Sequence, residues 1–169
     1  NNNILEFILS PKVLLVEGDA EYILSEKFFE IISDKKLKET DIHIISVGGT
    51  SFKRYMEIAR LLDIKTAVIR DNDGNYEKNC KENYEDYVND NVKVFYEDNN
   101  EFSTFEISMY ENNKKICEDL FSPRLKTRTV QKYMLDEKTE TAFELLDQKE
   151  DDLDVPEYIF NAIVWLTKD

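Results

Sequence analysis

The chain has 169 residues, of which 41% are hydrophobic and 12% aromatic, a composition that fits one globular domain with a core and excludes a disordered chain. Its formal net charge of −14 argues against nucleic-acid binding through the overall field, so a polyanionic partner would require metal ions or a local basic patch. No run of about 18 apolar residues that could span a membrane and no secretory leader is present, so we expect no membrane partner.

The cysteines indicate the redox compartment of the protein, and the first residues indicate how the chain is connected. Cys80 and Cys117 form no paired motif, which argues against zinc and a disulfide framework and favours a reducing cytoplasm. The chain begins with three asparagines and no methionine, and Ile4–Leu9 is a short apolar segment. We therefore expect residues 1–10 to be the end of a connection from a preceding part of a longer protein.

Apolar runs alternate with amphipathic segments from residue 12 to residue 96. The predicted strands are residues 12–16, 42–47, 65–70 and 92–96, and the predicted helices are a segment beginning at Asp19 and residues 52–62. Residues 75–91 are compatible with either helix or loop. Strands that alternate with helices predict crossover connections and a mainly parallel sheet, hence an α/β fold.

The last third of the chain is predicted to be mostly helical. Residues 139–146 and the segment after Pro156 carry apolar residues at helical spacing, and residues 147–154 form an acidic connection between them.

Unusual sequences follow the first three predicted strands. These are Glu17-Gly18-x-x-Glu21, Gly48-Gly49-Thr50-Ser51 and Asp71-Asn72-Asp73-Gly74. In a parallel sheet the carboxyl ends of the strands meet at one edge, where ligands bind. Two acidic clusters are therefore expected to converge there.

Such a convergence requires counter-charge. Two unit charges about 4 Å apart repel by roughly 4 kcal/mol at an effective dielectric constant near 20. Two Mg²⁺ or Mn²⁺ ions, which prefer oxygen ligands, would balance the carboxylates and suit phosphodiester cleavage. If strand geometry continues past Arg70, Asp71 and Asp73 point the same way, with Asp71 the first choice of ligand. The alternative interpretation is an ordinary Asp-x-Asp-Gly turn and a solvated helix face.

Three further features are open to two interpretations each. The Gly48–Ser51 turn either binds a phosphate at a helix N-terminus or is a plain cap. Glu106 is either a fifth metal-site carboxylate or a surface residue. The basic stretch 123–132 either contacts a phosphate backbone or is a solvated loop. Because His43 is the single histidine, a Ser/His or Cys/His hydrolase is not expected.

The combination of these motifs with Ser103-Thr104-Phe105-Glu106 and Lys138-x-x-x-Ala142-Phe143 resembles a known family. It is similar to the C-terminal Toprim domain of OLD-family (overcoming lysogenization defect) nucleases, and especially to the nuclease of the Gabija antiphage system. The resemblance implies a Rossmann-like, mainly parallel four-stranded sheet flanked by helices, with a Toprim core at residues 11–110 and a helical extension at residues 111–169.

The resemblance also implies a DNA endonuclease that uses two Mg²⁺ or Mn²⁺ ions. The metal site would comprise Glu17, Glu21, Asp71, Asp73 and Glu106. Glu17, Asp71 and Lys138 would be catalytic, with Lys138 stabilising charge on the phosphorus; Lys126, Lys132 and Lys149 are the alternative lysines. Contacts to phosphate or DNA are expected from Gly48, Gly49, Thr50, Ser51, Lys53, Arg124, Lys126 and Arg128.

The partners that the resemblance implies are DNA, an N-terminal ABC-type ATPase domain in the parent chain, a second copy of the protein and a UvrD-like helicase. Two alternatives stay open. One is a phosphatase of the haloacid-dehalogenase kind with Asp71 as nucleophile, although there the motif normally ends the first strand. The other is a Toprim module that serves assembly without catalysis.

Overall fold

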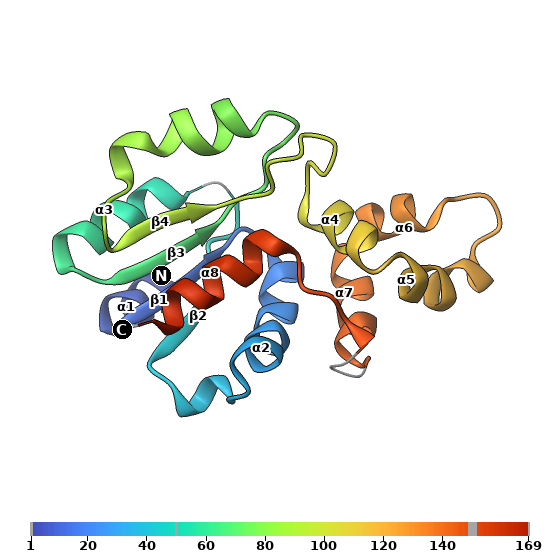
Figure 1. The fold of residues 1–169 in the computed structure, drawn as a ribbon, viewed down its shortest axis with the longest axis horizontal. Coiled ribbons are helices and arrows are strands. Elements are labelled where there is room, and N and C mark those ends of the chain that lie inside the picture. The colour runs from blue at the N-terminus through green and yellow to red at the C-terminus, as the bar shows by residue number, and fades with distance from the viewer. Residues whose placement is uncertain (1, 50, 149–151, 169) are drawn as a thin grey trace.

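The computed structural model describes residues 2–49, 51–148 and 152–168 and contains one sheet of four strands (Figure 1). The strands are β1 (Lys12–Val16), β2 (Ile42–Ser46), β3 (Lys65–Ile69) and β4 (Val92–Phe95). Their order is β2-β1-β3-β4, and every neighbouring pair is parallel. The predicted parallel α/β sheet is therefore confirmed.

Eight α-helices surround or extend this sheet within the described residues. They are α1 (Asn2–Leu9), α2 (Asp19–Ser33), α3 (Phe52–Leu62), α4 (Phe105–Asn112), α5 (Lys114–Phe121), α6 (Val130–Asp136), α7 (Lys138–Leu146) and α8 (Glu157–Thr167). Short 3₁₀ or π segments occur at η1 (Leu37–Glu39), η2 (Glu77–Lys81), η3 (Glu82–Tyr87) and η4 (Ser122–Arg124). No helix of the described residues has the length and apolar character needed to cross a membrane.

Apolar side chains cover both faces of the sheet, as expected for strands without polar alternation. On one face Leu14 and Val16 pack with α2 and α8. On the other face Val13 and Leu15 pack with Phe7 of α1 and with α3. Successive residues of β1 thus enter different cores.

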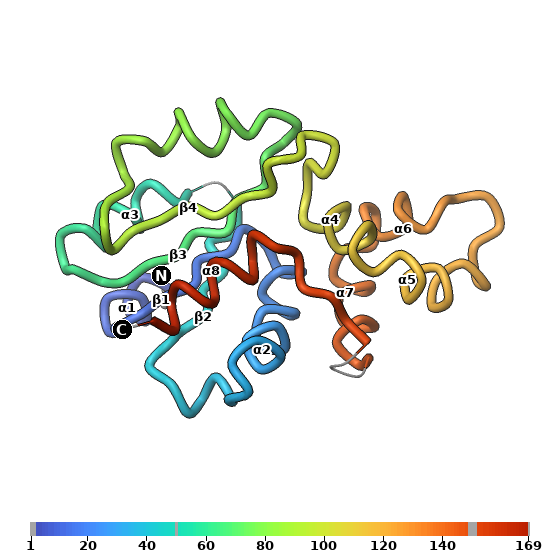
Figure 2. Tube along the Cα trace, in the orientation of Figure 1, coloured from blue at the N-terminus to red at the C-terminus, as the bar shows by residue number. Residues whose placement is uncertain are grey.

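The helices α4 to α7 form a lobe beyond the carboxyl ends of the strands (Figure 1). The lobe is held to the sheet layer by α7, which packs along α2. The chain then returns from α7 to α8, which lies across the strands and contacts β1, β3 and β4 (Figure 2). The edge of the sheet where β1 and β3 end consequently faces the lobe.

The segment between β3 and β4 is neither a regular helix nor an open loop. It contains the π turn η2 and the 3₁₀ turns of η3, which bury Tyr84 against Phe52 with ring centroids 6.4 Å apart. The helices predicted near residues 139–146 and after Pro156 are present as α7 and α8.

Candidate metal centre

The turn from β1 into α2 places two glutamates. Glu17 directly follows β1, whereas Glu21 lies in the first turn of α2 and is buried. Gly18 has a φ of −135°, which any residue can adopt. A Cβ at Gly18 would lie only 3.2 Å from Oε2 of Glu21. A larger residue at position 18 would therefore press on the Glu21 carboxylate and require it to shift by a few tenths of an ångström.

The segment after β3 contains Arg70, Asp71 and Asp73. The guanidinium of Arg70 is 7% exposed, and it donates to Glu17 Oε2 at 2.7 Å and to Asp73 Oδ2 at 2.5 Å. Asp73 has a φ of +49° and is half exposed. Strand β3 ends at Ile69, so the condition under which Asp71 and Asp73 were expected to share a face is not met.

Helices α4 and α7 add one carboxylate and one lysine near these residues. Thr104 caps α4 by accepting from the backbone N–H of Ile107, and Glu106 follows in the first turn, where it is buried. Lys138, the first residue of α7, donates from Nζ to Glu106 Oε2 at 3.0 Å. Among the lysines considered from the sequence that the structure describes, Lys138 lies at the carboxylates, whereas Lys132 pairs with Asp136 and Lys126 is exposed. Lys149 lies outside the described residues.

The buried carboxylates repel one another. Burial raises the pKa of Glu21 to about 7, and the charges of Glu106 and Glu17 add to this rise. Burial also raises the pKa of Asp71 well above its usual range, assisted by Glu21, Glu106 and Glu17. The charges of Glu17 and Glu106 act on both Glu21 and Asp71. These four carboxylates therefore form one electrostatic cluster at the sheet edge, which we call the carboxylate centre.

Lys138 belongs to the same centre. Burial opposes its charge, but the charge of Glu106 and the hydrogen bond to it raise the pKa of the Lys138 ammonium group, with further contributions from Asp71 and Glu21. Lys138 therefore stays protonated beside the carboxylates. Arg70 and Lys138 neutralise only part of the negative charge of the carboxylate centre and Asp73.

Whether this centre suits a metal ion depends on the arrangement of its side chains and on the chemistry of their donor atoms. Within residues 2–49, 51–148 and 152–168, no three His, Cys, Asp or Glu side chains are already arranged to hold a metal ion. Lys138 and Arg70 instead occupy oxygens of Glu106 and Glu17. The donors are nevertheless all carboxylate oxygens, which suit Mg²⁺ or Mn²⁺, and a divalent ion would offset both the burial and the repulsion that raise the pKa values of Glu21 and Asp71. The donor chemistry of the centre therefore suits such an ion, although in this structure the described side chains are not arranged around one.

The expected phosphate-binding turn is described only in part, because Thr50 lies outside the described residues. Gly48 and Gly49 have φ values of +67° and +122°, so both positions favour glycine. The N–H of Gly49 donates to the carbonyl oxygen of Glu17 at 3.1 Å. Ser51 lies at the N-cap of α3 without a side-chain capping bond. The Nζ atom of Lys53 lies over the rings of Tyr84 and Tyr87.

The basic stretch lies in the lobe, around η4 and the start of α6, and its arginines are paired. Arg124 pairs with Glu144, and Arg128 lies 3.4 Å from an oxygen of Asp136. Both guanidinium groups also lie near the ring of Tyr133. Lys126 is exposed. Acidic partners thus offset much of the positive charge that the sequence shows in this stretch.

Sequence reasoning missed Arg70, because it looks like the last residue of an apolar strand. The available signal was a charged residue at the end of a buried run, immediately before an aspartate. Such a residue is expected to be paired, since a buried charge without a partner is costly.

Part of the chain matches a protein-family model. Residues 8–73 match the model described as "Overcoming lysogenization defect protein-like, TOPRIM domain". The matched segment includes Glu17, Glu21, Asp71 and Asp73, whereas Glu106 and Lys138 lie beyond it. None of the curated proteins compared with the chain matches it significantly.

Solved structures share the whole fold. The chain is similar to the C-terminal region of the Burkholderia pseudomallei OLD protein, with a TM-score of 0.63 and 20% identity over 94% of this chain and 97% of that one. It is also similar to the C-terminal region of the Xanthomonas campestris pv. campestris OLD protein, with a TM-score of 0.55 and 20% identity over 94% of each chain. The expected Toprim-like architecture is therefore confirmed.

Proposed function

We propose that this chain is the catalytic Toprim domain of an OLD-family nuclease and hydrolyses DNA phosphodiester bonds with two Mg²⁺ or Mn²⁺ ions. The observation that carries the proposal is the convergence of four carboxylates and Lys138 at the carboxyl ends of β1 and β3. The match of residues 8–73 to an OLD-like Toprim model supports it independently.

The residues of the carboxylate centre would have different roles in catalysis. Glu17, Glu21, Asp71 and Glu106 would hold the ions, which when bound would activate water and stabilise the leaving oxygen. Asp73 would act through Arg70, which fixes Glu17 and Asp73 relative to each other. A metal at Glu106 would compete with Lys138 for its oxygen, and the freed ammonium group would be available to the phosphate.

The two alternative functions differ from this proposal in what they require. A phosphatase with Asp71 as nucleophile would hydrolyse small phosphate esters, and it gives no role to Glu21 or Glu106. A module that serves only assembly needs no buried, mutually repelling carboxylates, which lower stability. The raised pKa values of Glu21 and Asp71 therefore favour a catalytic metal centre.

The partners form the second part of the proposal. The structural likeness to C-terminal regions of OLD proteins supports an N-terminal ABC-type ATPase domain joined to this chain. With a net charge of −14 and paired arginines in the lobe, DNA affinity would come in large part from that domain or from a second copy. A role in Gabija-type antiphage defence with a UvrD-like helicase is the most specific form of this proposal.

A plasmid-nicking assay tests the function. Supercoiled DNA is incubated with the chain, or with its full-length parent, in Mg²⁺ or Mn²⁺, and the open-circular product is measured. We expect nicking that stops with EDTA and in Asp71→Asn but continues in Asp119→Asn, which changes an exposed carboxylate of α5. Nicking that persists in Asp71→Asn, or hydrolysis of p-nitrophenyl phosphate without nicking, would contradict the proposal.

A further inference from the structure

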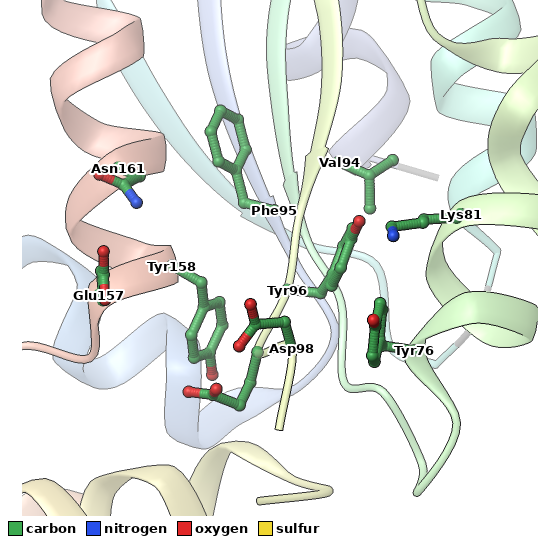
Figure 3. A pocket seen from close by; sticks show the side chains of 10 residues that line it. Tyr76, Lys81, Val94, Phe95, Tyr96, Asp98, Glu157, Tyr158 and Asn161 are labelled. Atoms are coloured by element: carbon green, nitrogen blue, oxygen red, sulfur yellow. The ribbon is translucent and has the colours of Figure 1, made fainter. Parts of the chain in front are cut away.

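A groove runs beside the free edge of the sheet, outside the carboxylate centre. Within the described part of the chain, strand β4 lies at the edge of the sheet and pairs with β3. The groove has a volume of about 350 Å³ and is lined by the end of β4, by Tyr158 and Asn161 of α8, and by Tyr76 and Lys81 at η2 (Figure 3). This volume lies in the range of small-ligand sites.

Two tyrosines form a preformed aromatic wall of this groove. The rings of Tyr76 and Tyr96 are stacked, with centroids 5.8 Å apart and an interplanar angle of 17° (Figure 3). Lys81 Nζ lies 4.7 Å from the centroid of Tyr76 and 3.0 Å from Glu77, so this lysine contacts both the ring and the carboxylate. Aromatic rings are the surfaces on which proteins stack unpaired nucleobases.

The polar groups of the groove select against a phosphate and for a base. The carboxylates of Glu97, Asp98 and Glu157 line it, and Lys81 is the single cation of the lining. An anionic group would be repelled by this set, whereas the amino group of cytosine, adenine or guanine would find acceptors. Thymine has no such amino group.

The groove is connected to the carboxylate centre. Asn72, which lies between Asp71 and Asp73, donates from Nδ2 to the carbonyl oxygen of Glu97 at 2.8 Å. Tyr158 lines the groove, and after burial the charges of Asp71 and Glu21 are the next causes that raise the pKa of its phenol. The groove and the carboxylate centre are therefore neighbours, joined through the hydrogen bond between Asn72 and Glu97.

We propose that this groove binds an unpaired, amino-bearing nucleobase of the DNA strand held at the carboxylate centre, by stacking on the Tyr76–Tyr96 wall. The inference rests on the proposed nuclease function and specifies its substrate: a strand with at least one base out of the duplex next to the cleaved bond. A base displaced from the duplex costs stacking energy, which the aromatic wall offsets in part.

A fluorescence titration tests the proposal. The probe is a single-stranded oligonucleotide with one 2-aminopurine, titrated with the chain or its full-length parent in Ca²⁺ to limit cleavage. We expect the protein to quench the 2-aminopurine, and Tyr96→Leu to weaken binding by about 5- to 100-fold. Tyr96→Phe should retain binding because it keeps the ring, which separates stacking from a folding defect. Tyr22→Leu, a change of an exposed tyrosine on α2, is the matched control.

Two competitors define the ligand. Unlabelled oligo(dC) should displace the probe at lower concentration than oligo(dT) of the same length, because cytosine carries the amino group. Free 2-aminopurine riboside should bind much more weakly than the oligonucleotide.

Several outcomes would overturn the proposal. They are equal binding by Tyr96→Leu and wild type, equal displacement by oligo(dC) and oligo(dT), or a riboside that binds as tightly as the strand, which would assign the groove to a free nucleotide. Binding of an extended peptide to the protein, with no quenching of the oligonucleotide probe, would assign the groove to a protein strand. Metal-dependent nicking without quenching defeats only this inference, and quenching without nicking defeats only the proposed activity.

Discussion

Lys138 Nζ lies 3.0 Å from Glu106 Oε2, although the two residues are 32 positions apart in the chain. The pair joins the first turn of α4 to the first turn of α7 and places one cation beside the buried carboxylates. The helical lobe thereby supplies two groups of the centre, so the sheet edge alone does not form the complete site.

Replacing Lys138 by Met should remove this cation without removing a proposed metal ligand. We expect Lys138→Met to lower the rate of metal-dependent nicking about a hundred- to a thousandfold, because Arg70, the other cation of the centre, is already paired with Glu17 and Asp73. Mn²⁺ binding should remain or become tighter, since Glu106 loses its competitor. The matched control is Lys132→Met, which breaks the exposed pair with Asp136 on α6 and should leave nicking unchanged. Nicking at the wild-type rate in Lys138→Met would exclude this role.

Stability without metal should depend on pH through Glu21. The pKa of Glu21 is about 7 in the folded protein against an ordinary value of 4.5, so the fold favours the protonated form. The resulting stabilisation is complete below the unfolded pKa and is lost as pH rises through about 7. Between pH 5.5 and pH 8 in EDTA, wild type should lose about 2 kcal/mol more unfolding free energy than Glu21→Gln.

Urea unfolding at the two pH values measures this difference. Glu26→Gln, which changes an exposed glutamate on the same helix, should behave like wild type. Excess Mg²⁺ should restore stability to wild type at pH 8, since a ligand that binds only the folded state stabilises it. The same pH dependence in wild type and Glu21→Gln would argue against the raised pKa.

Gly18→Ala should damage the centre and spare the fold. The backbone at Gly18 accepts alanine, but the new Cβ would lie 3.2 Å from Glu21 Oε2 and displace that carboxylate. We expect weaker Mn²⁺ binding with a metal-free unfolding free energy within about 1 kcal/mol of wild type. In a Glu21→Ala background the same change should have no further effect on metal binding, because the clash is gone. An additive loss in the double variant would contradict this explanation.

Arg70 should matter more for stability than an exposed arginine does. Arg70→Gln leaves Glu17 and Asp73 without their cation; since these carboxylates are 25% and 51% exposed, the loss should be about 1–3 kcal/mol, less than for a fully buried pair. The comparison is Arg124→Gln, which breaks an exposed pair with Glu144 and should cost about 0–1 kcal/mol. Thermal unfolding in EDTA measures both, and equal losses in the two variants would show that Arg70 is not a structural cation of the centre.

The strands were well predicted because each is determined by a local run of apolar residues. Runs such as residues 12–16 are apolar on both sides of the chain, and the structure buries both sides. Residues 75–91 carry no such periodicity, and their turns depend on the contact of Tyr84 with Phe52, which is distant in sequence. The boundaries between α4, α5 and α6 were also not predicted, because they too depend on contacts between residues distant in sequence.

The candidate site was predictable where a residue follows a strand, as Glu17 and Asp71 do. The placement of Lys138 could not be derived from spacing, because it depends on how α7 packs against α2. The orientation of Asp73 could not be derived either, because one positive φ at residue 73 turns its side chain toward Arg70, and a short Asp-x-Asp-Gly sequence is compatible with both conformations.

The most direct test of the proposed metal centre is a calorimetric titration of the metal-free chain with Mn²⁺ at pH 7.5. We expect binding by wild type and by the surface variant Asp119→Asn, and at least a tenfold loss of affinity in Asp71→Asn, because Asp71 lies within the carboxylate centre. No binding by wild type, or equal affinity in wild type and Asp71→Asn, would contradict the claim that this centre is a metal site.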